Sequence, residues 1–297
     1  MPTAGAGRAL EQLAATDPAV APLARLQAVA LDAAADPSWE RSLPASLGPR
    51  AEAGAPRLHG ARLVVDSDRL RALFVQLVAA LDAAGHPDSA RLRQLFAAPG
   101  FDPPASLRAS LVHDVPALED MAARVAATPG VLVVVAQAAA LPLLVACGRR
   151  AAATLDGRWT LGYCPVCAAW PTLAEVRGLA RELVLRCGRC GTGWPCEHRR
   201  CPFCGHREQH SQRYFAAAHE RETRRAITCS RCHGYLKVLA TLEPLAPSEI
   251  LLRDLESLEL DVTALEHGYR RPEGLGWSLA LTVESAPPPR GWLRWRG

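Results

Sequence analysis

Cys164-Pro165-Val166-Cys167 is the first of four C-x-x-C pairs that decide the fold of this 297-residue chain. The other three pairs repeat its spacing and are Cys187-Gly188-Arg189-Cys190, Cys201-Pro202-Phe203-Cys204 and Cys229-Ser230-Arg231-Cys232. None of the ten cysteines precedes Cys147 or follows Cys232. A two-residue spacer lets a tight turn direct both sulfurs at one ion, so a series of such pairs predicts metal ligation.

The four pairs divide into two units. Nineteen residues separate Cys167 from Cys187, and 24 separate Cys204 from Cys229. Both gaps suit a hairpin that returns one pair to the other, so each unit offers four thiolates in tetrahedral geometry. We therefore predict two Cys₄ metal sites of zinc-ribbon type, with the ligands Cys164, Cys167, Cys187 and Cys190 in the first and Cys201, Cys204, Cys229 and Cys232 in the second. Disulfides and redox-active dithiols are the alternative interpretations, and a thioredoxin-like dithiol lacks the βαβ context that it needs.

The residue that follows each pair indicates the geometry of its turn. Gly191 and Gly205 follow the second and third pairs, at a position where such a turn often requires a positive φ. Ala168 and His233 occupy the equivalent positions after the first and fourth pairs, and we expect an irregularity there.

Several further cysteines and histidines are candidates for the same chemistry. Cys196 and His198 lie between the two units, where they would either replace a ligand or form a reactive site, but an accessory thiol and a surface imidazole are the favoured interpretation. His206 and His210 are predicted to be solvated. Cys147 lies in an apolar run and is predicted to be a buried core thiol.

The first half of the chain is predicted to be helical. Alanine pervades residues 1–153 and is absent from Arg181 through Phe215, which places a boundary near residue 155. Apolar residues recur at helical spacing or in long runs within five segments, which are Pro22–Ala35, Arg69–Ala84, Asp88–Ala97, Pro116–Ala127 and Val131–Arg150. Asp66-Ser67-Asp68 is a predicted N-terminal cap for the second segment, and Gly85 ends it.

The second half is predicted to contain short strands that lead into the cysteine pairs. These segments are Trp159–Tyr163, Glu182–Leu185, Arg213–Ala217, Ala226–Thr228 and Tyr235–Leu239, followed by helices over Ser248–Leu255 and Asp261–Glu266. The predicted fold class is α+β, with an all-α domain over residues 1–155, a Cys₄ module over 156–197, a second over 198–242 and a short helical segment with a tail over 243–297.

The cysteines are predicted to lie in a reducing compartment. Met1–Leu10 contains no apolar core of a signal peptide. The longest apolar run, Val131–Cys147, is shorter than the roughly 20 residues that span a bilayer, so we expect a buried helix and no membrane insertion. A cytoplasmic protein is therefore expected, in which cysteines are more often metal ligands or redox groups than disulfides.

Charge is distributed unevenly. The chain has a net charge of +4, but the segment from Arg149 to Tyr235 has a net charge of +8. This basic segment raises nucleic-acid binding as an alternative function. Lys237 is the only lysine, so a solvated arginine-rich surface in a chain with biased codon usage is the preferred interpretation.

The sequence resembles the FdhE family of formate dehydrogenase accessory proteins over residues 160–272. The resemblance rests on Tyr163 through Cys167, Leu185 through Gly191, Arg200 through Gly205, Cys229 through Lys237, Asp254 through Asp261 and Glu266-His267-Gly268-Tyr269. It implies a helical N-terminal domain followed by two rubredoxin-like or zinc-ribbon modules. It also implies that each C-x-x-C cysteine is a ligand, with iron the family expectation and zinc its chemical rival, so that two iron or zinc ions are expected.

The resemblance implies a non-catalytic maturation factor that contacts the molybdenum- or tungsten-containing catalytic subunit of formate dehydrogenase. The sequence contains no Gly-rich phosphate loop, H-E-x-x-H motif or nucleophile elbow. A four-cysteine site is also closed to substrate water, which favours a structural role. A redox role of the ion toward the client remains an alternative, beside a nucleic-acid-binding double ribbon.

Overall fold

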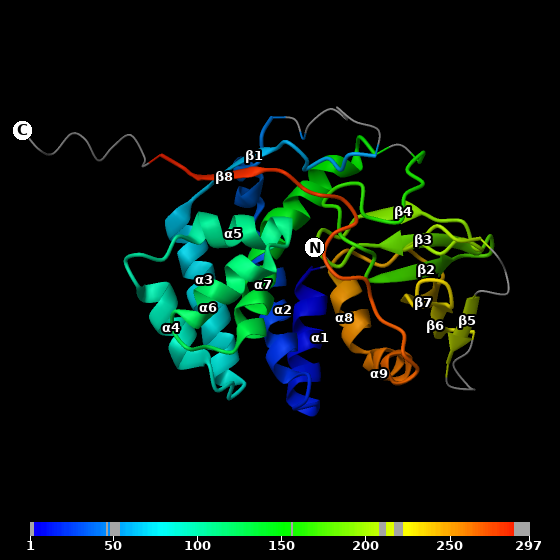
Figure 1. Ribbon diagram of the computed structural model, residues 1–297, viewed down its shortest axis with the longest axis horizontal. Coiled ribbons are helices and arrows are strands. Elements are labelled where there is room, and N and C mark those ends of the chain that lie inside the picture. Colours follow the sequence, from blue (N-terminus) through cyan, green and yellow to red (C-terminus); the bar gives the residue numbers. More distant parts are fainter. Residues whose placement is uncertain are drawn as a thin grey trace, which may run out of the picture.

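The computed structural model of the chain describes residues 3–45, 47, 54–155, 157–207, 212–216 and 222–287. A helical half and a six-stranded sheet lie side by side, as Figure 1 shows. The helices and strands of the first half are α1 (Thr3–Thr16), α2 (Ala21–Ala34), the 3₁₀ helix η1 (Pro37–Ser42), β1 (Arg62–Val65), α3 (Ser67–Ala83), α4 (Ser89–Ala97), α5 (Pro103–Val112), α6 (Val115–Ala123) and α7 (Pro129–Ala152). The predicted α+β class with a helical N-terminal region and two cysteine modules is confirmed.

Helix α7 is the centre of the helical half. It packs against α2, α3, α5 and α6, and its buried residues include Leu132, Leu144 and Cys147. By length and composition it is the one helix of the described chain apolar enough to cross a membrane, but 67% of its most apolar window is buried against the rest of the protein. Burial of this kind is what a core helix shows, as the sequence predicted.

Helix α3 begins and ends where its capping residues predict. The side chain of Asp66 accepts hydrogen bonds from the backbone N–H groups of Asp68 and Arg69, at 3.1 Å each. Gly85 follows the helix with a φ of +71°. An N-cap carboxylate satisfies donors that the first helical turn leaves free, and glycine adopts the left-handed conformation without steric cost.

The sheet joins the two cysteine units. Its strands are β2 (Leu173–Arg177), β3 (Glu182–Arg186), β4 (Gly193–Pro195), β5 (Gln212–Phe215), β6 (Arg224–Cys229) and β7 (Tyr235–Thr241), in the order β4-β3-β2-β7-β6-β5. Each unit contributes an antiparallel three-stranded ribbon, and the two ribbons meet where β2 pairs in parallel with β7.

The expected strand over Trp159–Tyr163 is wrong. The indole Nε1 of Trp159 donates a hydrogen bond to the carbonyl of Tyr163 at 2.8 Å, and the two rings pack edge to face with centroids 5.5 Å apart. The segment therefore folds back on itself before the first cysteine pair and has no neighbouring strand.

The C-terminal segment connects both halves. Helices α8 (Glu249–Leu255) and α9 (Leu258–Glu266) match the two predicted helices, and α8 contacts α1 and α2 whereas α9 packs on β5, β6 and β7. Strand β8 (Thr282–Ser285) then pairs in parallel with β1, back in the helical half (Figure 1). This pairing was not predicted, and most of the predicted tail lies outside the described residues.

Candidate metal centres

The four C-x-x-C pairs form four turns with one shared hydrogen-bond pattern. In every turn the N–H of the first cysteine donates to the carbonyl five residues later, at 2.8 or 2.9 Å, in the pairs Cys164–Ala169, Cys187–Thr192, Cys201–His206 and Cys229–Gly234. Such a bond closes the turn behind the two sulfurs and leaves both side chains on one side of it. The local sequence therefore presets the direction of each pair of thiols.

The residue after each pair adopts the left-handed conformation. The φ angles are +76° at Gly191 and +75° at Gly205, as predicted, and they are +64° at Ala168 and +55° at His233. The turn thus keeps its conformation even where a Cβ is present, although a left-handed residue other than glycine costs about 1–2 kcal/mol. The first and fourth turns therefore differ from the other two in the type of residue at this position, and not in their left-handed backbone conformation.

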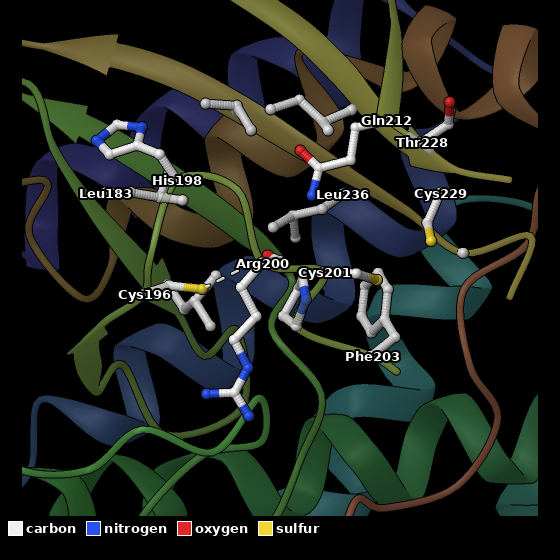
Figure 2. A pocket seen from close by; sticks show the side chains of 15 residues that line it. Leu183, Cys196, His198, Arg200, Cys201, Phe203, Gln212, Thr228, Cys229 and Leu236 are labelled. Atoms are coloured by element: carbon white, nitrogen blue, oxygen red, sulfur yellow. Dashed lines mark hydrogen bonds between the residues drawn. The ribbon is translucent and has the colours of Figure 1, made fainter. Parts of the chain in front are cut away.

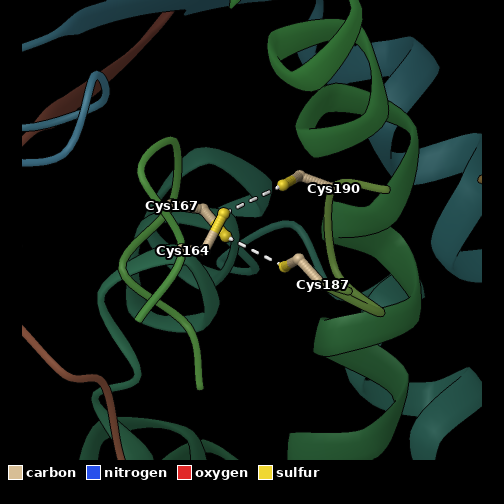
Figure 3. A group of neighbouring side chains, drawn as sticks. All are labelled: Cys164, Cys167, Cys187 and Cys190. Carbon is tan, nitrogen blue, oxygen red and sulfur yellow. Dashed lines mark hydrogen bonds between the residues drawn. The ribbon is translucent and has the colours of Figure 1, made fainter. Parts of the chain in front are cut away.

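The first group consists of Cys164, Cys167, Cys187 and Cys190, and Figure 3 shows their side chains converging from two turns. All four sulfurs lie within 4.8 Å of one another, with Sγ–Sγ distances of 3.4 Å for Cys164–Cys190 and 3.5 Å for Cys167–Cys187. Metal–sulfur bonds of ~2.3 Å in a tetrahedron imply sulfur–sulfur edges of ~3.8 Å. The spacing therefore suits one four-coordinate ion.

The second group consists of Cys201, Cys204, Cys229 and Cys232, whose sulfurs also lie within 4.8 Å of one another. Its Sγ–Sγ distances are 3.7 Å for Cys201–Cys232 and 3.8 Å for Cys204–Cys229. All ten cysteines are free thiols. The two units that the spacing predicted are therefore the two groups that the fold assembles, and each could hold a metal ion.

The two groups differ in exposure. The first belongs to the main hydrophobic core, and none of its cysteines exposes more than 2% of its surface. In the second group Cys201 and Cys229 are buried, whereas Cys204 and Cys232 reach solvent. Access to the two sites is therefore unequal.

Burial and neighbouring thiols shift the pKa values of the cysteines in both groups. Burial raises the pKa of Cys164 and of Cys190, and hydrogen bonds from neighbouring thiols lower the pKa of Cys167. Burial also raises the pKa of Cys232 to about 11. Four buried thiolates repel one another, so they ionise together only when a metal ion neutralises them.

The first group is held by the helical half. The N–H groups of Arg57 and Leu58 donate to the carbonyls of Pro165 and Val166 in the first turn, at 2.8 and 3.0 Å. On the other side, Gly148 of α7 lies so close to the second turn that a Cβ there would clash with the carbonyl oxygen of Cys190. Neighbouring Cys147 is fully buried, as predicted for a core thiol, and burial raises its pKa.

The second group is supported by a buried charge network. Lys237 on β7 is 0% exposed, and its Nζ lies 2.6 Å from a carboxylate oxygen of Asp254 and of Asp261. Arg271 pairs with the same two carboxylates at 2.8 and 2.9 Å, and the hydroxyl of Tyr235 donates to Asp261 at 2.7 Å. The network joins β7 to α8 and α9. This network was not predicted from the sequence, in which its members lie in separate segments.

Cys196 and His198 belong to neither group. Both line a small apolar cavity of about 30 Å³ between the sheet and the third turn, which Figure 2 shows together with Cys201 and Cys229. Burial raises the pKa of Cys196 to about 11, and Nε2 of His198 lies 2.6 Å from the carbonyl of Arg181. His206 also lies outside both groups, and His210 is outside the described residues.

Many arginines of the basic segment have acidic partners. Ion pairs involve Arg149, Arg150, Arg177, Arg186, Arg207 and Arg224. Arg186 and Glu175 are both buried in one of these pairs. This pairing reduces the charge that the segment offers to a polyanion.

Comparison with known proteins relates the chain to one family. Residues 200–275 match the family model described as "FdhE, C-terminal domain". The chain is 32% identical over 120 residues to "Protein FdhE homolog" of Aquifex aeolicus, a match that covers 39% of this chain and 41% of that protein. It is 35% identical over 112 residues to "Protein FdhE" of Escherichia coli O127:H6, covering 37% of this chain and 35% of the relative. The matched segment thus spans about two fifths or less of these curated relatives.

The likeness extends further in three dimensions. The crystal structure of the FdhE protein from Pseudomonas aeruginosa superposes with a TM-score of 0.58 and 25% sequence identity, covering 94% of this chain and 95% of that one. The helical half, whose sequence shows only a general likeness, is therefore included in the structural match. Together with the family model over residues 200–275 and the curated relatives, this match relates the chain to FdhE proteins, in sequence over its cysteine-rich part and in fold over most of its length.

Proposed function

We propose that this protein is a non-catalytic maturation factor for formate dehydrogenase that acts in the cytoplasm and binds the immature catalytic subunit. The observation that supports it best is the pair of Cys₄ groups joined by one sheet in a fold of the FdhE family. In this proposal residues 1–155 form a helical support, 156–197 and 198–242 form the two metal modules, and 243–297 tie the modules to the support.

Each group holds one iron or zinc ion in this proposal. The ligands are Cys164, Cys167, Cys187 and Cys190 in the first module and Cys201, Cys204, Cys229 and Cys232 in the second. A bound ion supplies folding free energy, on the order of 10 kcal/mol for structural zinc in small modules. Four protein thiolates leave no coordination position for a substrate, so the ions stabilise a surface and do not activate water.

The two-ribbon module is the part that contacts the client. The solvent-accessible Cys204 and Cys232 place the second group at the protein surface, whereas the first is enclosed by α7 and the segment before β1. The second module is therefore the one that a partner subunit reaches directly, and the first fixes its position on the helical half.

Paired variants test this function. Cys164→Ser and Cys201→Ser should each remove the ion from its own module, and both should abolish formate dehydrogenase activity in a strain that depends on this protein. Cys196→Ser is the matched control, because Cys196 lies in the same region but outside both groups. Full formate dehydrogenase activity with a Cys201→Ser protein that has lost its ion would refute the proposal.

A second measurement identifies the ion. Ferric Cys₄ sites absorb strongly in the visible region, and zinc, with a filled d shell, does not. An absorption spectrum recorded with elemental analysis of the purified protein therefore separates iron from zinc.

A further inference from the structure

A hollow of about 390 Å³ lies at the end of the sheet that β5 and β6 form. The lining residues that matter here are Arg181, Arg213, Tyr214, Glu222, Arg225 and Ile227. Sites for small organic ligands commonly enclose about 300–1,000 Å³, so this hollow is large enough for one.

Side chains from two neighbouring strands face this hollow. Tyr214 of β5 lies opposite Ile227 of β6 in their antiparallel register. Because side chains alternate along a strand, Arg225 lies on the same face of the sheet as Ile227, two residues before it. All three residues line the hollow. A phenol ring, an apolar side chain and a guanidinium therefore occupy neighbouring positions on one face.

Arg181 adds a second guanidinium from the turn between β2 and β3. Its φ is +53°, in the left-handed region, and its N–H donates to the carbonyl of Gly178 at 3.2 Å. Its own carbonyl accepts a hydrogen bond from Nε2 of His198 at 2.6 Å. His198, which belongs to neither cysteine group, therefore fixes the backbone of an arginine that lines the hollow.

Positive charge predominates in the lining of the hollow, where Arg181, Arg213 and Arg225 face the single carboxylate of Glu222. Burial lowers the pKa of Arg225, the neighbouring charge of Arg181 lowers it further, and Glu222 raises it. Among the residues that the structure describes, Arg181 and Arg213 form no ion pair. An anion would relieve the repulsion between Arg181 and Arg225, and guanidinium groups bind phosphate through paired hydrogen bonds.

The ring of Tyr214 gives the hollow an accessible flat surface. Tyr214 exposes 46% of its surface, and Ile227 lies beside it in the lining. Nucleobases stack on aromatic side chains whatever their identity, because every base has a π face. Two guanidinium groups next to an exposed aromatic ring suit a ligand that combines a phosphate with a planar ring.

From these observations we infer that the hollow binds a nucleoside phosphate. Arg181 and Arg225 hold the phosphate, and the base stacks on Tyr214. The volume of the hollow suits one nucleotide, and ion pairs elsewhere in the basic segment reduce the charge that a longer strand would meet. A free mononucleotide is therefore the ligand that we assign. The inference goes beyond the proposed function and does not depend on which client the protein serves.

Calorimetric titration of the intact protein with adenosine 5′-monophosphate and with guanosine 5′-monophosphate tests this site. One molecule should bind per chain. Adenosine, which lacks the phosphate, should bind at least about tenfold more weakly, and ribose 5-phosphate, which lacks the base, at least about fivefold more weakly. No saturable binding of either nucleotide, or equal binding of adenosine or of ribose 5-phosphate, would overturn the inference.

Variants locate the binding. Arg225→Gln should weaken nucleotide binding by about tenfold, and Tyr214→Ala by about fivefold or more. Tyr214→Ala alters an exposed side chain on the edge strand, so its effect is separable from folding. Wild-type affinity in both variants would refute the site.

Arg224→Gln is the matched control. It removes the same charge from the same strand but on the opposite face, where Arg224 pairs with Glu259 at 3.5 Å, and it should bind nucleotide like the wild type. An equal loss of affinity in Arg224→Gln and Arg225→Gln would show a general effect of charge and would refute the site.

A single-stranded oligonucleotide distinguishes a free nucleotide from a nucleic acid. A decamer of deoxyadenylate should bind no more tightly, per nucleotide, than adenosine 5′-monophosphate, because the hollow accommodates one base and its phosphate. Binding of the decamer that is tenfold tighter than that of the mononucleotide would overturn the assignment to a free nucleotide.

Discussion

Gly148 on helix α7 lies directly against the carbonyl oxygen of Cys190, a residue of the first cysteine group. The backbone of α7 therefore lies directly against the backbone of the second cysteine turn, with no side chain between them. The first group is part of the main core, and all four of its cysteines are buried.

Replacement of this glycine should separate the helix from the turn. Gly148→Ala places a Cβ against backbone that cannot move aside, and overpacking of this kind costs about 1–3 kcal/mol. We expect a lower midpoint of chemical unfolding and weaker metal retention in the first group. Gly130→Ala is the control on the same helix, because a Cβ there meets nothing within 4 Å. An equal loss of stability in both variants would contradict the role of the contact.

Removal of the lysine charge should be strongly destabilising. Lys237→Met leaves Asp254 and Asp261 with Arg271 as their remaining cation in the network, and breaking a buried ion pair costs about 3–5 kcal/mol. Arg253→Met removes an exposed cation from α8, the helix that carries Asp254, and should cost about 1 kcal/mol or less. Chemical denaturation of the two variants compares them. A loss in Lys237→Met no larger than that in Arg253→Met would show that the network contributes nothing.

The same network predicts a pH dependence. Burial alone would raise the pKa of Asp254, but Arg271 and Lys237 lower it below the usual value of 3.8. A carboxyl whose folded-state pKa is depressed stabilises the fold above its unfolded pKa, and this stability is lost as the pH falls through the folded pKa. The wild type should therefore resist acid to a lower pH than Lys237→Met. Identical acid-unfolding midpoints for the two proteins would exclude a contribution of Lys237 to this pKa.

Unequal exposure predicts unequal release of the two ions. Cys204 and Cys232 reach solvent, whereas the four thiols of the first group are enclosed. A chelator in excess should therefore remove one ion per chain several-fold faster than the other, and Cys201→Ser should lack the fast phase. Release of both ions in a single phase would argue against this difference.

The local part of this structure could be predicted from the sequence. C-x-x-C spacing determines the turns and their pairing, and the Asp66 cap and Gly85 mark the ends of α3. The contact of Gly148 with Cys190 could not be foreseen, because a helical glycine carries no sign of its distant neighbour. The pairing of β1 with β8 joins segments 220 residues apart in the register Arg62–Thr282, and such short strands have no pattern of their own.

Polar contacts between segments that are distant in the sequence could not be predicted either. Lys237 and its partners lie on separate elements, and in the sequence each of these charged residues, considered alone, is typical of a surface position. The strand expected before Cys164 is absent because this segment makes local contacts instead of pairing with another strand: the indole of Trp159 donates to the carbonyl of Tyr163, and the two rings pack edge to face.

Native mass spectrometry of the purified protein tests the central claim, that two four-cysteine groups each hold one metal ion. The wild type should carry two ions per chain, while Cys164→Ser and Cys201→Ser should each carry one. The Cys196→Ser control should retain two. A wild-type chain without bound metal, or two ions retained in both group variants, would contradict the account.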